Sequence, residues 1–293
     1  MLAFLNDTLV PMEEARVPVM DRGFLYGDAV FETMAVYEGR PFRLDRHLAR
    51  LVEACRAVSI SLPCSADMME QRILRTIEAN RLENGLVRFS LTRGRSTRGL
   101  DTRGCSDPTF LVLCFPPKPP PASLRRGGAT VEVSSWRRIP SRCLPSGAKT
   151  ANYLNNILAF REAAERGAQE ALMLTLDDEV AEGTVSNFFF VRKGLLLTPP
   201  LDLGILPGIT RLVVLEAAER LGIVVRECRF RLEDLAAFDE AFYTNSNVVM
   251  MPAGVIDEYR FQVPGVVTQA LQKEVARLIL EEAGHCWAFD GSS

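Results

Sequence analysis

Short apolar runs interrupted by turn residues open the chain, and this pattern is typical of antiparallel hairpins. Apolar residues then recur at helical spacing from Leu44 onward and again from Met68, which predicts two amphipathic helices. Two more strand-like runs follow them. The elements predicted here are strands at residues 2–5, 31–37, 86–92 and 109–115, and helices at residues 44–58 and 68–77.

A proline-dense segment follows the last of these strands and contains five prolines within residues 116–123. Proline fixes φ and lacks a backbone N–H group, so this density favours an extended, semi-rigid connector. We therefore expect an N-terminal domain over residues 1–115, a connector over residues 116–123 and a C-terminal domain over residues 124–293.

Strands and helices alternate irregularly beyond the connector, without the regular order of a parallel α/β fold. The chain shows no internal repeat. We therefore expect an α+β fold. The predicted elements are strands at residues 129–134, 171–176, 188–191, 195–197, 224–228 and 241–243, and helices at residues 153–166, 210–221 and 267–283.

Composition narrows the class of protein. Of the 293 residues, 47% are hydrophobic and 24% are charged, as in an ordinary globular protein with a large core. The net charge of −3 supplies no global basic field for nucleic acid or an anionic membrane. Seven scattered cysteines and two histidines predict no metal site, and no apolar run approaches the roughly 18 residues of a membrane span. We expect a cytoplasmic protein without nucleic-acid or membrane partners.

Lysine is rare in this chain, so each of the four lysines can be considered alone. Lys118 lies among the prolines, Lys193 in a predicted turn and Lys273 on a predicted helix, where lysine is normally solvated. Lys149 lies between small residues in SGAKTANYLNN, just before a predicted helix. If Lys149 is buried there, its pKa falls and it can act as a nucleophile or base. The alternative is that Lys149 lies in a solvated surface loop and has no catalytic role.

Four other polar segments have both a functional and a structural interpretation. Glu182 follows an apolar strand and is either a carboxylate of the site or a simple turn residue. Pro207-Gly208 precedes a predicted helix whose start could bind an anion or be capped in the ordinary way. The cluster at residues 244–247 could bind phosphate or cap a turn, and the arginine-rich loop at residues 92–104 could bind a carboxylate or be solvated. No dinucleotide, P-loop, zinc-protease or serine-hydrolase motif occurs.

Five sequence blocks occur in the order DRGFLYGDAVFET, HLARL, KTANYL, VAEGTVSN and GILPGITR, with TNS beyond residue 240. Taken together, they resemble the fold-type-IV pyridoxal-phosphate enzymes, the class-IV aminotransferases. The resemblance implies a two-domain fold, with a small N-terminal α/β domain and a larger, β-barrel-like C-terminal domain with flanking helices. It also implies pyridoxal 5'-phosphate as cofactor, a small-molecule amino substrate and a homodimer.

The same resemblance assigns roles to individual residues. Lys149 would be the Schiff-base lysine and would move protons once displaced by the substrate amine, and Tyr153 would contact the cofactor. Glu182 would pair with the pyridine nitrogen and keep it protonated, which strengthens the ring as an electron sink. The residues implied to hold the phosphate are Arg50, Ile209, Thr210, Ser246 and Asn247.

Within the family, the chain is most similar to the 4-amino-4-deoxychorismate lyases of folate biosynthesis, which release 4-aminobenzoate and pyruvate. The resemblance implies that Phe31, Thr33 and Arg98 bind the substrate. The Tyr-x-Arg motif of branched-chain aminotransferases is missing around Arg88, and the Arg-x-His pair of D-amino-acid aminotransferases retains only Arg98. The alternatives are an aminotransferase acting on branched-chain or D-amino acids with 2-oxoglutarate and, more remotely, a non-catalytic binding protein on the same fold.

Overall fold

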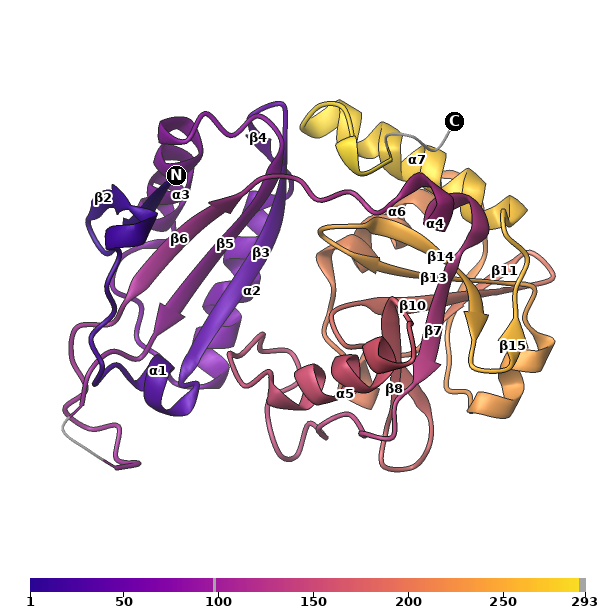
Figure 1. Cartoon of the computed structure of the whole chain (residues 1–293), viewed down its shortest axis with the longest axis horizontal. Coiled ribbons are helices and arrows are strands. Elements are labelled where there is room, and N and C mark those ends of the chain that lie inside the picture. Colours follow the sequence, from indigo (N-terminus) through magenta and orange to yellow (C-terminus); the bar gives the residue numbers. More distant parts are fainter. Residues whose placement is uncertain (97–98, 290–293) are drawn as a thin grey trace. The chain divides into compact units, whose positions relative to one another are not determined.

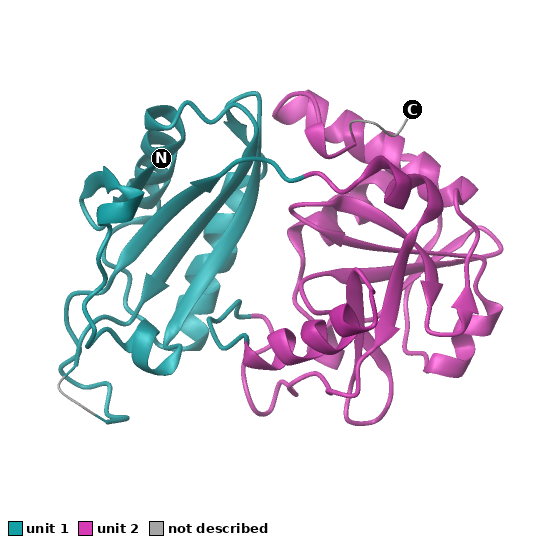
Figure 2. Ribbon diagram, viewed as in Figure 1, with its two compact units in different colours: residues 1–118, 148–153 teal, residues 119–147, 154–293 magenta. Residues whose placement is uncertain are grey.

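The computed structural model describes residues 1–96 and 99–289, and the chain divides into two compact units (Figure 2). Unit 1 comprises Met1–Lys118 and Ala148–Tyr153, and unit 2 comprises Pro119–Gly147 and Leu154–Ser293. The first crossing, between residues 118 and 119, lies inside the proline-dense segment. The chain returns to unit 1 for the six residues Ala148–Tyr153, and no change of composition marks this return.

Unit 1 contains a six-stranded sheet in which every neighbouring pair is antiparallel (Figure 1). The strand order is β2-β1-β6-β5-β3-β4, and the antiparallel hairpins predicted for the start of the chain are present as β1–β2 and β3–β4. The elements are β1 (Leu2–Leu5), β2 (Thr8–Pro11), η1 (Met12–Glu14), α1 (Arg22–Tyr26), β3 (Ala29–Tyr37), β4 (Arg40–Pro41), α2 (Leu44–Ala57), α3 (Ala66–Ala79), β5 (Gly85–Thr92) and β6 (Phe110–Phe115).

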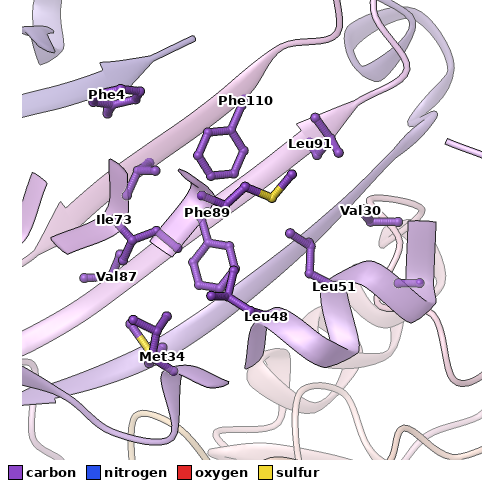
Figure 3. Close-up of a cluster of buried hydrophobic side chains, with 14 of the residues drawn as sticks. Phe4, Val30, Met34, Leu48, Leu51, Ile73, Val87, Phe89, Leu91 and Phe110 are labelled. Atoms are coloured by element: carbon purple, nitrogen blue, oxygen red, sulfur yellow. The ribbon is translucent and has the colours of Figure 1, made fainter. Parts of the chain in front are cut away.

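The core of unit 1 forms where one face of this sheet packs against α2 and α3 (Figure 3). Burial alternates along β5, so Val87 and Phe89 are fully buried while Arg88 between them is only partly buried. Figure 3 shows Phe89 among Leu48 and Leu51 of α2. Because strand side chains alternate between faces, the opposite face of β3 and β5 remains available for polar chemistry.

Unit 2 is built on a nine-stranded mixed sheet with the order β12-β11-β10-β13-β14-β7-β8-β9, and β15 pairs with β14. The edge strand β9 leads into β10 through only three residues, 184–186, so the sheet must curl to return β9 to β10. The strands are β7 (Ala129–Val133), β8 (Glu170–Leu174), β9 (Val180–Gly183), β10 (Asn187–Arg192), β11 (Leu195–Thr198), β12 (Val225–Glu227), β13 (Glu240–Asn245), β14 (Val249–Ile256) and β15 (Tyr259–Arg260).

Helices flank this curled sheet: α5 packs on β7 and β8, and α6 and α7 pack on each other and on β13 (Figure 1). This architecture confirms the predicted α+β, barrel-like C-terminal fold. No helix among residues 1–96 and 99–289 is both long and apolar enough to cross a membrane. The helices are α4 (Ala122–Gly127), α5 (Leu154–Glu165), η2 (Leu201–Leu203), α6 (Ile209–Arg220), η3 (Leu232–Ala237), α7 (Val266–Glu282) and η4 (Trp287–Phe289).

Three local predictions need correction. The segment predicted as an extended connector over residues 116–123 is extended only to Pro121, because α4 begins at Ala122. Glu182 lies inside β9 rather than at a turn, and β14 was missing from the predicted strands. Both missed strands are fully or mainly buried, so they lack the alternation that marks a half-exposed strand.

A buried carboxylate from β13 caps the long helix α7. Glu240 accepts hydrogen bonds from the backbone N–H groups of Val267 (3.0 Å) and Thr268 (2.8 Å) and from the Thr268 hydroxyl (2.7 Å). The N-cap residue Gly265 has no side chain to do this, and a Cβ there would lie 2.1 Å from Glu240 Oε2. The tertiary carboxylate therefore replaces a local cap and offsets the helix dipole.

A second buried carboxylate, Glu170 of β8, anchors the turn between β9 and β10. It accepts hydrogen bonds from the hydroxyls of Thr184 and Ser186 and from the N–H groups of Thr184 (3.1 Å) and Ala171 (2.9 Å). No ion pair joins it to a basic side chain in the described part of the chain. Burial raises the pKa of this carboxyl, although the four hydrogen bonds act in the opposite direction.

The core predicts that Phe89→Ala destabilises the protein by about 3–5 kcal/mol, because a fully buried ring is removed and a cavity remains. Urea unfolding measures this free energy. Leu74→Ala, at a site on α3 that is 39% exposed, is the control and should change stability by less than about 0.5 kcal/mol. A loss below about 1 kcal/mol for Phe89→Ala would contradict the packing described.

The Glu170 site predicts a pH-dependent stability. A raised pKa means that the folded state binds more protons than the unfolded state above about pH 4.5, so wild-type stability falls as pH rises through that window. Glu170→Gln removes this titration, and the stability advantage of wild type over the variant should therefore shrink as the pH rises above about 4.5. Urea unfolding of both proteins at each pH measures this difference in the free energy of unfolding. Glu165→Gln, at an exposed position, is the control. An advantage that grows with pH would refute the assignment.

Candidate active site

The segment at residues 148–153 pairs with the start of β3 and thereby fixes Lys149 on unit 1. The Phe31 N–H group donates to the Lys149 carbonyl (2.9 Å), and the Ala151 N–H group donates to the Ala29 carbonyl (2.8 Å). The Asn152 side chain adds a bond to the Gly27 carbonyl (3.1 Å). Because these bonds hold the backbone on both sides of Lys149, its side chain leaves a rigid support.

The Lys149 amine lies among aromatic groups. Its Nζ is 2.6 Å from the Tyr153 hydroxyl, 4.7 Å from the centroid of Phe31 and 5.1 Å from that of Tyr153. The two rings meet edge to face at 5.1 Å. Lys149 forms no ion pair with a carboxylate among the described residues, so its amine has a hydroxyl partner and an aromatic surface but no counter-charge.

Arg88 of β5 lies on the same face of the sheet as Phe31, and it was not predicted as a site residue. Its guanidinium carbon lies 3.7 Å from the centroid of Phe31, and β3 and β5 place it opposite Thr33. Burial lowers its pKa, against a smaller opposing effect of Tyr153. Arg88 makes no hydrogen bond or ion pair within the part of the chain described. A desolvated guanidinium without a protein anion is suited to bind the carboxylate of a ligand.

Arg50 lies in α2 and binds Glu32, which faces the core side of β3. Arg50 Nε donates to Glu32 Oε1 and its Nη2 donates to Oε2, each at 2.7 Å, and His47 Nδ1 lies 2.8 Å from Oε2. The Arg50 charge and the hydrogen bonds from Arg50 and His47 hold the pKa of Glu32 at about 2, although its burial acts to raise it. The Glu32 carboxylate is therefore ionised at neutral pH.

In unit 2, the carboxylate of Glu182 is held by three donors. Arg138 Nε donates to Oε1 (2.5 Å), while the Leu206 N–H group (2.9 Å) and Asn187 Nδ2 (3.3 Å) donate to Oε2. The residue is 5% exposed. A carboxylate offers about four lone-pair sites, so these contacts leave room for one more donor.

The start of α6 is arranged for an anion, because its N-cap is Gly208 and no side chain caps it. A Cβ at Gly208 would lie 2.0 Å from Asn187 Oδ1, so only glycine lets this helix start lie against Asn187. Ile209 and Thr210 form the first turn, where backbone N–H groups have no intrahelical acceptor. The sequence left open whether this helix start binds an anion or is capped in the ordinary way; the structure has no side-chain cap there, and a bound anion stays a prediction.

The turn after β13 contains a buried polar atom without a partner. Asn245 Oδ1 accepts from the N–H groups of Asn247 and Val248, each at 2.9 Å, and this closes the turn that holds Ser246. Asn247 Oδ1 is buried and makes no hydrogen bond within the described chain. Since an amide can rotate to present either its oxygen or its NH₂ group, this side chain is suited to a ligand with several acceptors.

The predicted site residues fall into two sets, and the roles assigned to them stay predictions. Arg98 lies outside the described residues. Within the described ranges, no group of three or more histidine, cysteine, aspartate or glutamate side chains is arranged to hold a metal ion. Unit 1 carries Phe31, Thr33, Arg50, Lys149 and Tyr153, and unit 2 carries Glu182, Ile209, Thr210, Ser246 and Asn247.

Sequence reasoning missed three polar partners, namely Arg88, Arg138 and Asn187. A signal for Arg88 existed, because a single cation interrupts the apolar run of residues 86–91. Asn187 was inside a quoted block but had no role until its amide reached Glu182. Arg138 carried no local signal, since it lies 44 residues before the carboxylate that it contacts.

The chain matches the family described as "Amino-transferase class IV" over residues 29–256. It is 38% identical over 257 residues to a putative branched-chain-amino-acid aminotransferase of Methanocaldococcus jannaschii, covering 88% of each chain. It is 33% identical over 296 residues to the aminodeoxychorismate lyase of Bacillus subtilis, covering 98% of this chain and 99% of the lyase.

Solved structures agree with these relatives. The branched-chain aminotransferase from the thermophilic archaeon Thermoproteus uzoniensis, solved with norvaline, superposes with a TM-score of 0.89 at 34% identity, covering 96% of this chain and 95% of that one. The 4-amino-4-deoxychorismate lyase from Pseudomonas aeruginosa superposes with a TM-score of 0.84 at 31% identity, covering 96% and 99%. A further branched-chain aminotransferase, with a TM-score of 0.91 at 29% identity, was solved with pyridoxamine 5'-phosphate and covers 98% of this chain and 96% of its own.

The family match spans most of the chain, and both relatives exceed 30% identity over nearly their whole length. The expected fold, the pyridoxal-phosphate cofactor and the enzymatic nature of the protein are thereby confirmed. The comparisons include lyases and aminotransferases at similar identity, so they define the family and leave the reaction open. This chain therefore belongs to the class IV amino-transferase family of pyridoxal-phosphate enzymes.

Proposed function

We propose that this protein is a 4-amino-4-deoxychorismate lyase, which releases 4-aminobenzoate and pyruvate. The observation that carries this choice is the alignment with the Bacillus subtilis lyase, which runs through 98% of this chain and 99% of the relative. The alignment with the more identical aminotransferase covers only 88% of each chain. The Phe31-x-Thr33 pattern also supports a lyase by resemblance.

The residues present fit pyridoxal phosphate. Lys149 offers an amine without a carboxylate partner in the described chain, and Glu182 offers an oriented carboxylate with room for one more donor. The uncapped start of α6 at Ile209 and Thr210 suits a phosphate site, and so does the buried Asn247 amide once it is rotated to present its NH₂ group as a donor. We propose these residues as cofactor ligands, together with Arg50, Tyr153 and Ser246.

When bound, pyridoxal phosphate supplies a ring that takes up the electron pair left after a C–H bond breaks. The chain supplies the proton transfers. Lys149 Nζ would accept the proton from the ring carbon that bears the amino group, and the ring C–O bond to the enolpyruvyl group would break as the ring becomes aromatic. The same proton, returned to the methylene carbon of the departing enolate, would give pyruvate. Tyr153 lies 2.6 Å from this nitrogen and holds it in place, while Glu182 keeps the pyridine nitrogen protonated.

Substrate recognition is assigned to the face of unit 1 that carries Lys149. Phe31 supplies an aromatic surface and Thr33 a hydroxyl, and Arg88 lies beside them as a desolvated cation. We propose that Arg88 binds one carboxylate of the substrate, and we retain Arg98 as a second carboxylate ligand on the grounds of the resemblance.

An aminotransferase is the second candidate, because Arg88 would serve equally well as a ligand for the carboxylate of an amino acid. The incomplete carboxylate-binding motifs of both aminotransferase groups weighed against this activity in the sequence, whereas the position of Arg88 beside Phe31 supports it. The 38% identical relative adds support. This enzyme would transfer an amino group from a branched-chain or D-amino acid to 2-oxoglutarate.

We also propose a homodimer, because apolar side chains are exposed on an element of each unit. In unit 1, Phe24 of α1 is 75% exposed, and in unit 2 Leu154 and Ile157 of α5 are 67% and 57% exposed. Leu154 and Ile157 are three residues apart and share one face of α5, and a contiguous apolar surface of this kind marks an interaction site. We propose a cytoplasmic location, in keeping with the seven cysteines, none of which forms a disulfide bond.

The cofactor assignment predicts that borohydride reduction of the yellow holoenzyme, followed by peptide mass spectrometry, finds the pyridoxyl group on Lys149. The reason is that Lys149 is held beside Tyr153 and Phe31, whereas solvated lysines gain no such placement. Lys118, Lys193 and Lys273 are internal controls. A pyridoxyl group mainly on one of these would disprove the assignment.

The lyase proposal predicts equal amounts of 4-aminobenzoate and pyruvate from aminodeoxychorismate, with no 2-oxo acid added, since elimination needs no amino acceptor. Chromatography and a pyruvate assay measure both products. Arg88→Met should lower kcat/KM by roughly 10- to 100-fold through loss of a charged hydrogen bond. If no 4-aminobenzoate forms and 2-oxoglutarate is converted to glutamate with an amino-acid donor, the aminotransferase is the correct activity.

A further inference from the structure

We propose that Glu32 and His47 are positioning residues that present Arg50 to the phosphate group of the cofactor. This inference rests on the proposed role of Arg50 as a phosphate ligand. It adds two residues that would contact neither the cofactor nor the substrate, and that act through the orientation of a single guanidinium.

The geometry of the three side chains is that of a clamp. Arg50 Nε and Nη2 donate to the two oxygens of Glu32, each at 2.7 Å, which is the bidentate arrangement that fixes a guanidinium in both position and plane. His47 Nδ1 lies 2.8 Å from Glu32 Oε2 and holds the carboxylate in turn. His47 thereby orients Glu32, and Glu32 orients Arg50.

Arg50 is more exposed to solvent than Glu32 and His47. The side chain of Arg50 is 12% exposed, that of His47 is 3% exposed and that of Glu32 is 1% exposed. Glu32 therefore lies in the core of unit 1, between the buried residues Val30 and Met34 of β3. The arginine is the member of the clamp with the most access to solvent.

Placing charges in this core costs free energy that an apolar side chain at residue 32 would avoid. Desolvation of an ion pair usually offsets most of its Coulombic attraction, so a buried pair is weak evidence of a stabilising role. The arrangement is instead suited to orientation, because an unrestrained arginine has many rotamers and loses that freedom when it binds an anion. The clamp removes this freedom before the phosphate arrives.

The charges of the clamp also suit this role. Burial lowers the pKa of His47 despite the opposing effect of Glu32, so the imidazole is neutral at neutral pH and donates a hydrogen bond without adding charge. Glu32 balances Arg50 when no phosphate is bound. A guanidinium has five N–H donors in one plane, and the two bonds to Glu32 fix the direction in which the others point.

The experiment compares two probes that differ only in the phosphate group, pyridoxamine 5'-phosphate and pyridoxamine. Fluorescence titration of the full chain freed of cofactor gives the dissociation constant of each, and their ratio reports phosphate recognition. The variants are Arg50→Ala, Glu32→Gln, His47→Leu and His47→Asn. The matched control is Glu53→Gln, which breaks an exposed ion pair with Arg56 on the same helix.

We expect Arg50→Ala and Glu32→Gln each to weaken pyridoxamine 5'-phosphate binding by roughly 10- to 100-fold, with little change for pyridoxamine. His47→Leu should show a smaller loss in the same direction. His47→Asn should restore the wild-type ratio, because its amide can donate to Glu32 in place of Nδ1. Glu53→Gln should leave both constants unchanged.

Other outcomes separate the two levels of the proposal. If Arg50→Ala leaves the ratio unchanged, Arg50 is not a phosphate ligand and that part of the proposed function fails. If Arg50→Ala lowers phosphate recognition but Glu32→Gln or His47→Leu weakens both probes equally or neither, the clamp is structural and this inference is overturned. Should Glu32→Gln fail to fold, the two His47 variants still decide the question.

Discussion

The site depends first on the pairing between residues 148–153 and the start of β3. The Phe31 N–H group and the Lys149 carbonyl are joined at 2.9 Å, so the lysine and the ring beside its amine belong to one hydrogen-bonded ladder. This pairing requires the chain to enter unit 1 for six residues and leave again. A lysine on a free loop would lack both its aromatic surroundings and the fixed contact with Tyr153.

The alternation of strand side chains extends this arrangement to the rest of unit 1. One face of β3 and β5 holds Phe89 and other apolar residues of the core, while the opposite face holds Phe31 and Arg88. Glu32 is the exception, because it is a carboxylate on the core face. Its contact with Arg50 explains how a charge is retained in an apolar environment: the ion pair and His47 satisfy both oxygens.

Unit 2 uses fixed donors and carboxylates in a similar way. Glu170 holds the turn between β9 and β10, and the strands on either side of this turn carry Glu182 and the Asn187 that contacts it. Gly208 allows the start of α6 to lie against Asn187. A substitution far from any reacting atom, in Glu170 or Gly208, would thus move the groups that are proposed to hold the cofactor.

The sequence by itself determined the fold class, the amphipathic helices, the hairpins and the blocks that identify the family, because hydrophobic periodicity and local motifs are properties of short segments. It also singled out Lys149 and Glu182. Only the tertiary structure decided that Arg88 faces Phe31, that Arg138 binds Glu182 and that Arg50 is clamped by Glu32. These partners lie far apart in sequence, and strand register and helix packing, rather than local pattern, bring their side chains into contact.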